Sequence, residues 1–335
     1  MRRTLFAVAV VAFLAMPAPA SADPPPPLST QAGCGSFATA PVSVTKVLTI
    51  VLENTDYSSL IGSADAPNMN DLASSCGLAT DYHGIQFPSL PNYLGMTAGQ
   101  IPPNIAGDGS RGIDCQPAPD CQSLFPSIFT QIGEQAAANP LAPLSWRTYA
   151  EDMPTNCALS NSGNYAARHN PAVYYPNDAP ACALDDVPAG TPADGALATD
   201  LAAGTLPNYG LLIPNLCNDG HNVCNGVPRV AEEDATIGAW MPAILASPDY
   251  TSGHLLVVIT ADSSSSATND NHLATILVNQ DIPSGTQVAE PFDHYSLLRT
   301  TEDLLGLAPL GNAAAAEDMA TWFNIPVPLV PPPNG

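Results

Sequence analysis

The sequence contains very few basic residues. Among 335 residues there are 8 Lys and Arg against 31 Asp and Glu, so the formal charge is −23, and Lys46 is the sole lysine. A protein that binds a nucleic-acid backbone needs a basic face to neutralise the phosphates. This chain cannot assemble such a face, and we therefore expect no nucleic-acid partner.

Charged residues of either sign are also scarce, at 12%, whereas hydrophobic residues make up 45% of the chain. Disordered chains show the opposite balance, because they lack the apolar surface that a core needs. We therefore expect a folded protein, and the length fits a single α/β domain with additional loops. The 36 prolines and 24 glycines predict that many of these loops are irregular.

The chain also lacks an apolar run that is long enough to span a bilayer. Arg2 and Arg3 precede a short apolar stretch at 5–16, which is followed by the small residues at 20–22. This order is typical of a cleaved secretory signal. We therefore expect residues 1–22 to be a signal peptide, and the mature protein to be secreted without integral membrane association.

No CxxC pair occurs among the eight cysteines, which argues against a zinc site. All eight follow the expected cleavage site, and an even number of cysteines in a secreted chain is typical of disulfides. Spacing alone leaves several connectivities open. The pairs that it suggests are Cys115–Cys121, Cys217–Cys224, Cys157–Cys182 and Cys34–Cys76.

Two runs of aliphatic residues, 47–52 and 255–260, are typical of strands that are buried on both faces. The other expected strands are 77–82, 145–149, 208–214 and 273–278, and the expected helices are 67–75, 90–98, 230–246 and 295–305. This alternation predicts an α/β fold in which a mostly parallel central sheet is flanked by helices on both faces.

The remaining segments define the expected domain boundaries. A loop-rich insertion is expected at 100–142, and the Pro- and Ala-rich residues 23–42 are expected to form an extended lead-in. Residues 43–325 would then form one domain, and residues 326–335 a Pro-rich tail.

Polar side chains gather where the expected strands end. Glu53 and Asn54 follow the first strand, Asp262 follows the strand at 255–260, and Ser89 precedes a helix. Ligands of open α/β sheets bind beyond the carboxyl ends of the strands. Carboxylates from two such ends can hold a divalent cation, and a helix N-terminus favours a phosphate. The pattern therefore predicts a cation that activates the Ser89 hydroxyl.

Each of these residues also has a structural interpretation when it is taken singly. Ser89 could be a helix cap, and Asp262 could be a turn residue. The histidines could equally be structural. The hypothesis of a site therefore depends on the joint placement of these residues at the strand ends.

Six segments, taken in order, resemble one known family. They are 50–54 (IVLEN), 88–94 (PSLPNYL), 165–171 (YAARHNP), 214–221 (PNLCNDGH), 258–262 (VITAD) and 294–303 (HYSLLRTTED). The chain resembles the bacterial phosphoesterase family that contains secreted acid phosphatases and phospholipases C. That family is a branch of the alkaline-phosphatase-like superfamily, and the resemblance covers residues 45 to about 310.

The resemblance implies an alkaline-phosphatase-like fold and a metal-dependent enzyme that hydrolyses phosphate monoesters through a serine nucleophile. Ser89 would be the nucleophile, Asn92 would steady a phosphoryl oxygen, and His221 would be a general acid or a phosphate ligand, supported by Asp219. The implied metal ligands are Glu53, Asn54, Asp262 and Asp219, and the implied substrate contacts are Asn54, His169 and His294. The cofactor would be a divalent cation of open identity, and the substrate a phosphate ester of a small molecule or of a phospholipid headgroup.

Two positions depart from the family pattern. Phe87 stands where the family usually has His, two residues before the serine, and Ser263 stands where it usually has a further carboxylate. The loss of a carboxylate weakens cation binding, unless Asp270 or His272 compensates for it. Two alternatives therefore remain, a phosphodiesterase of phospholipase C type and a catalytically impaired exported relative that acts as a binding protein.

Overall fold

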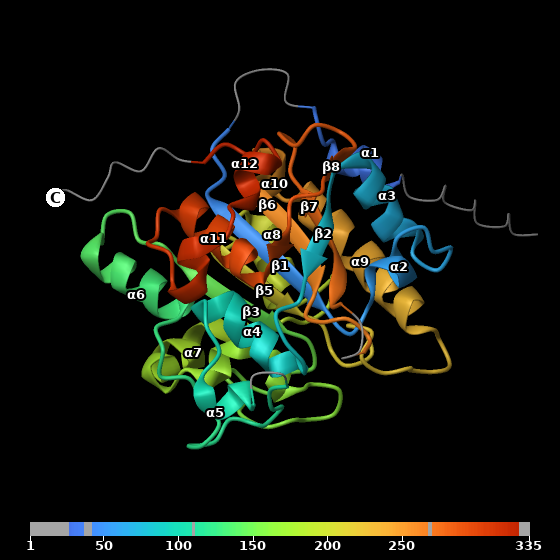
Figure 1. Ribbon diagram of the computed structural model, residues 1–335. Coiled ribbons are helices and arrows are strands. Elements are labelled where there is room, and N and C mark those ends of the chain that lie inside the picture. The colour runs from blue at the N-terminus through green and yellow to red at the C-terminus, as the bar shows by residue number, and fades with distance from the viewer. Residues whose placement is uncertain (1–26, 37–41, 109–110, 267–269, 328–335) are drawn as a thin grey trace, which may run out of the picture.

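The structure is a computed structural model that describes residues 27–36, 42–108, 111–266 and 270–327 (Figure 1). The expected signal peptide at 1–22 lies outside the described residues, as do positions 328–335 of the expected tail.

Nine strands of the described chain form one sheet, in the order β4-β3-β5-β1-β6-β7-β2-β8, with β9 paired to β2. The strands are β1 Lys46–Leu52, β2 Gly77–His83, β3 Trp146–Ala150, β4 Asp186–Pro188, β5 Tyr209–Ile213, β6 Leu255–Ala261, β7 His272–Val278, β8 Thr286–Val288 and β9 Phe292–Asp293. All pairings are parallel except those of β7, which runs antiparallel to β6 and to β2. The predicted mostly parallel sheet is therefore confirmed.

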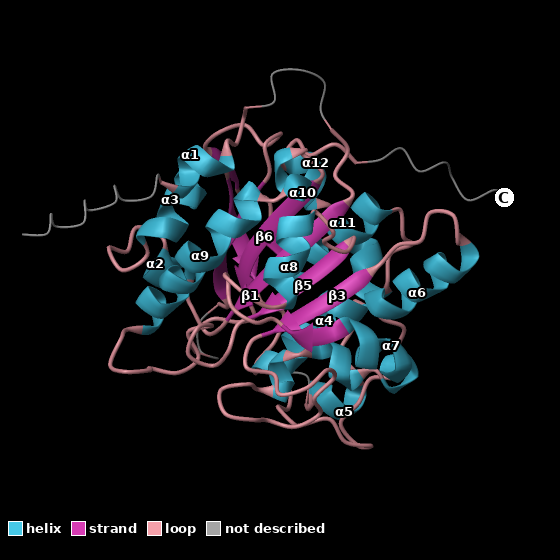
Figure 2. Ribbon diagram, turned by 180° about the vertical axis from the view of Figure 1, so that it is seen from behind, coloured by secondary structure: helices cyan, strands magenta, loops and turns pink. Residues whose placement is uncertain are grey.

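Helices cover both faces of this sheet, as the sequence predicts (Figures 1 and 2). The α-helices are α1 Leu28–Ala32, α2 Tyr57–Leu60, α3 Pro67–Ser75, α4 Ser89–Ala98, α5 Pro103–Ala106, α6 Ile128–Ala138, α7 Ala179–Asp185, α8 Ala196–Ala203, α9 Arg229–Ala246, α10 Pro248–Thr251, α11 His294–Leu305 and α12 Met319–Trp322. On one face α4 packs against α6 and α11, and on the other α9 packs against α3 and α8.

Three helices, α1, α5 and α6, lie where the sequence predicts irregular chain. Helix α6 lies inside the expected loop-rich insertion, where the Ser127 and Thr130 side chains form a capping box at its N-terminus. Helix α1 lies in the lead-in that was expected to be extended, and Asp71 accepts a hydrogen bond from the Ser29 backbone N–H. The disulfide Cys34–Cys76 ties this segment to the end of α3.

The other three suggested pairs, Cys115–Cys121, Cys157–Cys182 and Cys217–Cys224, are also present as disulfides. Four disulfides are typical of proteins that fold outside the reducing cytoplasm. Among the helices of the described residues, none combines the length and the apolar character that crossing a membrane requires.

The central strands β1 and β6 are parallel neighbours and end at the same level of the sheet. Every residue of β6 is buried, and six of the seven residues of β1 are buried, because helices cover both faces. Leu52 is paired with Ala261 at the last position of this parallel ladder. The residues that follow, Glu53 and Asp262, therefore leave the sheet side by side, and the Asp262 N–H donates to the Leu52 carbonyl at 3.0 Å.

Candidate active site

The Ser89 hydroxyl connects the two carboxylates that follow β1 and β6. Its Oγ donates to Glu53 Oε2 at 2.9 Å, and although burial raises the pKa of the neighbouring Asp262 carboxyl group overall, the same hydroxyl lowers that pKa. All three side chains are buried. Two strand ends and one helix N-terminus, which are far apart in the sequence, thus meet at one point, as the strand-end pattern predicts.

Helix α4 presents a second hydroxyl to the same carboxylate. Tyr93 lies one helical turn after Ser89, so both side chains point from the same face of α4. The Tyr93 hydroxyl donates to Glu53 Oε1 at 2.9 Å. Burial raises the pKa of this phenol well above its usual range, so the group stays protonated and remains a donor.

Asn54 joins the same pair of carboxylates through its backbone and its side chain. Its backbone N–H donates to Asp262 Oδ1 at 3.2 Å, and its Nδ2 donates to Glu53 Oε2 at 3.0 Å. The residue has φ of 53°, in the left-handed region, which Asn adopts more readily than most side chains. This turn directs the chain away from the sheet directly after Glu53.

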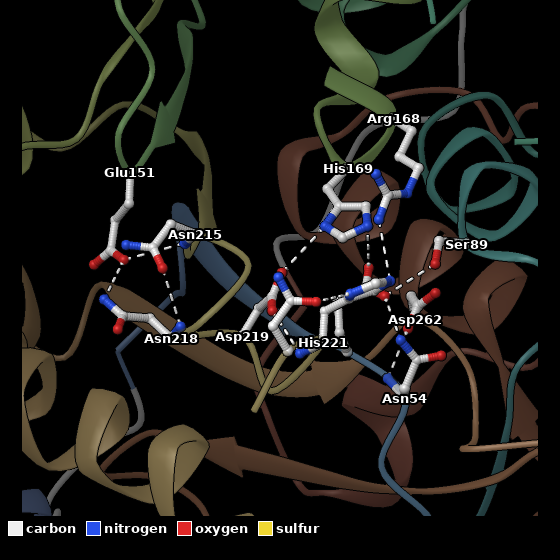
Figure 3. A network of polar contacts seen from close by, with 12 residues as sticks. Asn54, Ser89, Glu151, Arg168, His169, Asn215, Asn218, Asp219, His221 and Asp262 are labelled. Carbon is white, nitrogen blue, oxygen red and sulfur yellow. Dashed lines mark hydrogen bonds and ion pairs between the residues drawn. The ribbon is translucent and has the colours of Figure 1, made fainter. Parts of the chain in front are cut away.

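His169, in the 3₁₀ helix η1 (Ala167–His169), is held in one orientation by Asp219 (Figure 3). The ring is buried, and its Nδ1 donates to Asp219 Oδ2 at 3.1 Å. Burial, together with the nearby positive charge of Arg168, holds the pKa of His169 well below its usual range, so the imidazole is neutral. Its Nε2 then carries a lone pair, makes no hydrogen bond, and lies 3.3 Å from Glu53 Oε1.

The loop that carries Asp219 is shaped by a disulfide and a glycine. The disulfide Cys217–Cys224 closes the loop around this carboxylate. Gly220 has φ of +85°, and a Cβ at this position would lie 1.9 Å from Glu233 Oε1. Only glycine therefore fits at this position, beside the Asp219 carboxylate.

Arg168 supplies a positive charge at the edge of the site. Its Nη2 donates to His221 Nε2 at 3.0 Å, and its Nε lies 3.4 Å from Asp114 Oδ2. The Arg168 side chain is 19% exposed. The other oxygen of Asp114 accepts the Leu90 backbone N–H at 2.9 Å, so this carboxylate connects the guanidinium to the first turn of α4.

Burial and mutual repulsion disfavour the charged forms of the carboxylates in this site. Burial, followed by repulsion from Asp262 and Asp219, raises the pKa of Glu53 well above its usual range. Burial also raises the pKa of Asp262 to about 7. A cation beside these groups would restore their charged forms. The ligand atoms of Glu53, His169 and His221 lie within 4.8 Å of one another, which is close enough for one metal ion.

The carboxylates, the unpartnered His169 Nε2 and the oxygen-rich surroundings therefore fit a divalent cation. His169 Nε2 lies 3.3 Å from Glu53 Oε1, and these two residues would help to hold such a cation. Figure 3 shows His169, Ser89, Asp262 and Asn54 turned toward this common centre, whereas the group around Glu151 lies apart from it.

The model of one protein family matches residues 59–308, and its description is "Phosphoesterase family". This match covers most of the chain and includes Ser89, Asp219 and Asp262.

The chain belongs to the phosphoesterase family. It is similar to the phosphatidylinositol-3-phosphatase of Mycobacterium tuberculosis, with 26% identity over 84% of each chain. It is also similar to the phosphate-repressible acid phosphatase of Penicillium chrysogenum, with 27% identity over 79% of this chain and 60% of the relative. A probable acid phosphatase of Kluyveromyces lactis shows 29% identity over 82% of this chain and 62% of the relative.

Solved structures show the same fold at low sequence identity. A protein of the alkaline phosphatase superfamily from Vibrio parahaemolyticus superposes with a TM-score of 0.55 and 12% identity, covering 88% of this chain and 78% of that one. The alkaline-phosphatase-like fold and the resemblance to the phosphoesterase family are therefore confirmed. The chain is an acid-phosphatase-like hydrolase of phosphate esters.

Two residues of this phosphoesterase that we expected to contact substrate are engaged by the protein itself. Asn92 accepts hydrogen bonds from the backbone N–H groups of Ile85 and Gln86, and its amide donates to the Gln86 and Pro88 carbonyls. His294 Nε2 donates to the Asp262 backbone carbonyl at 2.6 Å. These contacts shape the loop before Ser89 and the strand end at Asp262.

The ring of His294 has a second partner on strand β2. Its Nδ1 accepts a hydrogen bond from the Tyr82 hydroxyl at 2.9 Å. Burial lowers the pKa of His294 to about 4, so this imidazole is neutral, and both of its nitrogens are occupied.

The two departures from the family pattern leave no replacement ligand beside Asp262. The Ser263 hydroxyl donates to Asp262 Oδ2 at 3.2 Å, so it supports the remaining carboxylate. His272 Nε2 donates to the Thr80 carbonyl at 2.8 Å, which holds this ring at the start of β7. Asp270 and His272 line a separate cavity and are not among the described ligand atoms that lie close together.

The sequence analysis did not assign roles to Tyr93, Arg168 or Asp114. Tyr93 could have been found, because its spacing of four from Ser89 places both on one face of a helix. Arg168 is adjacent to His169 in the sequence, and this position was the only indication that Arg168 belongs to the site. Nothing in the sequence indicates that Asp114 packs against the start of α4.

Proposed function

We propose that this phosphoesterase is a metal-dependent phosphomonoesterase that uses Ser89 as its nucleophile. The observation that carries the proposal is the Ser89 hydroxyl, which donates to Glu53 and lies beside Asp262, at the ends of neighbouring strands. The fungal relatives are acid phosphatases by name, which supports the same class of substrate. The chain spans about 60% of the length of those relatives, so their activity is carried over here only as part of the proposal.

The residues that would hold the divalent cation are Glu53, Asp262, Asn54 and His169. When bound, the cation would lower the pKa of a neighbouring hydroxyl and offset the negative charge of the phosphoryl group. In this proposal Asp219 orients His169 through Nδ1 rather than ligating the cation itself, because its Oδ2 accepts the Nδ1 proton.

Ser89 Oγ would attack the phosphorus atom as its proton passes to Glu53. The bond between phosphorus and the leaving oxygen would break, and the alkoxide released would take a proton from water. The Ser89 hydroxyl proton already points at Glu53 Oε2, which leaves the Oγ lone pairs directed away from this carboxylate. Glu53 Oε2 accepts this hydrogen bond, so it is the group placed to receive the proton. Water would then release phosphate from the phosphoserine.

Arg168 would bind the phosphoryl oxygens. The guanidinium uses one N–H toward His221 and one toward Asp114, so further N–H groups remain for an oxyanion. We assign His221 to the positioning of Arg168, because its Nε2 accepts a hydrogen bond from Arg168 and its Nδ1 donates to Asn222 Oδ1 at 3.0 Å. Asn92 and His294 are assigned as positioning residues.

The test is hydrolysis of p-nitrophenyl phosphate by the full mature chain, before and after treatment with a chelator. We expect turnover that falls at least about a hundredfold on chelation and returns when Mn²⁺, Zn²⁺ or Ca²⁺ is added. Bis(p-nitrophenyl) phosphate, a diester, is run in parallel and is expected to react more slowly. No turnover with any cation between pH 4 and pH 9 would contradict the proposal and would favour a binding protein.

A further inference from the structure

A cavity of about 430 Å³ lies beside the proposed site, and its lining residues are Asp56, Tyr57, Ser58, Asp270 and His272. The segments that follow β1 and β6 lead first through the proposed site and then toward this cavity. Asp56 follows Glu53 by three residues, and the Ser265 hydroxyl, three residues after Asp262, donates to Asp56 Oδ2.

The end of strand β2 contacts the segment that carries Asp270. His83, at the end of β2, contacts the Asp270 carbonyl through Nδ1 at 2.9 Å. The Gly84 N–H then donates to the Asn271 carbonyl at 2.9 Å. The segments that follow Glu53 and Asp262 therefore lead toward this cavity, which lies at the same edge of the sheet as the proposed site.

Aromatic rings form one side of the cavity. Tyr57 and His272 are stacked, with centroids 4.4 Å apart and planes 5° apart, and His83 stacks on His272 at 5.1 Å. The hydrogen bond from His272 Nε2 to the Thr80 carbonyl fixes the middle ring. Tyr57 is the end ring of the stack, so His272 covers only one of its faces.

The charge of the lining is negative. Asp56 and Asp270 contribute carboxylates, and none of the described residues that line the cavity is Lys or Arg. Burial lowers the pKa of the neighbouring His83, but hydrogen bonds to the Asp270 carbonyl and to Asp81 raise it, and the net shift is upward. Asp81 Oδ1 lies 2.8 Å from His83 Nε2. A leaving group that carries further negative charge would be repelled here, whereas an ammonium group would be attracted by the carboxylates and by the Tyr57 ring.

We propose that this cavity binds the leaving-group half of the substrate and selects an alcohol that carries an ammonium group. The inference rests on the proposed phosphomonoesterase function and assigns its substrate class. Asp56, Asp270 and Tyr57 are the specificity-determining residues, and none of them belongs to the proposed catalytic or cation-binding set.

The test compares choline phosphate with 3,3-dimethylbutyl phosphate, which has the same shape and no positive charge. For the full mature chain we expect kcat/KM to be about tenfold higher for choline phosphate. In Asp270→Asn and in Asp56→Asn this ratio should fall toward one, while hydrolysis of the uncharged ester is unchanged. Glu134→Gln, an exposed carboxylate on α6, is the matched control and should keep the wild-type ratio.

Equal kcat/KM values for the two esters in the wild type would overturn the proposal, as would an unchanged ratio in both cavity variants. Calorimetric titration with choline alone gives a second measurement that needs no turnover. Weaker choline binding in Asp270→Asn than in the wild type supports the cavity, and absence of choline binding to the wild type contradicts it. Failure to hydrolyse p-nitrophenyl phosphate would instead contradict the proposed function.

Discussion

Replacing Ser89 with alanine is expected to lower kcat for p-nitrophenyl phosphate at least about a thousandfold, because the attacking oxygen is lost. The fold should persist, since the only side-chain hydrogen bond of Ser89 among the described residues is the one to Glu53. Steady-state kinetics on the purified variant, with circular dichroism to check the fold, measures this effect.

The matched control for this variant is Tyr93→Phe. It removes the other hydroxyl that α4 donates to Glu53, but it leaves the nucleophile in place. We expect a loss of about tenfold in kcat, since only the orientation of the carboxylate changes. If Ser89→Ala and Tyr93→Phe reduced the rate equally, the hydroxyl of Ser89 would be a supporting group and not the nucleophile.

Replacing Glu53 with glutamine is expected to weaken the binding of a divalent cation at least about a hundredfold, because the shared ligand loses its charge. Titration calorimetry of the chelator-treated protein with Mn²⁺ or Zn²⁺ measures the affinity. Glu302→Gln is the control, since Glu302 is also buried and has its pKa raised by burial to about 8, but it lies on α11 outside the site. Its affinity for the cation should equal that of the wild type.

The same titration should depend on pH in one direction. Without a cation the pKa of Asp262 is about 7, so below pH 7 this carboxyl group is protonated and must release a proton before it can bind. The apparent affinity should therefore fall by at least about tenfold for each pH unit below 7, since Glu53, whose pKa is also raised, releases a proton on binding as well. An affinity that stays constant between pH 5 and pH 7 would show that Asp262 does not take part in cation binding.

The central part of the fold could be predicted because its signal is local. The sequences of β1 and β6 do not alternate between apolar and polar residues. This pattern is typical of strands that are covered on both faces. The antiparallel direction of β7 was not foreseen, because strand direction is decided by pairing partners and not by residue type. Helix α6 was also missed, since proline and glycine dominate the interval around it.

The candidate site could also be predicted only in part. The meeting of Glu53, Ser89 and Asp262 followed from the rule that strand ends share one edge of a sheet. The partners of Asn92 and His294 could not be read from the sequence, because they are backbone groups brought near by the fold. A polar residue in a motif can face the substrate or hold the loop that does, and only the structure separates these roles.

Rapid quenching in acid during turnover, followed by mass spectrometry of the peptide that contains Ser89, tests the central claim most directly. If the Ser89 oxygen attacks phosphorus, part of the enzyme should carry one phosphoryl group on Ser89, and chelation before mixing should abolish this modification. Normal turnover with a phosphoryl group on another residue would contradict the account.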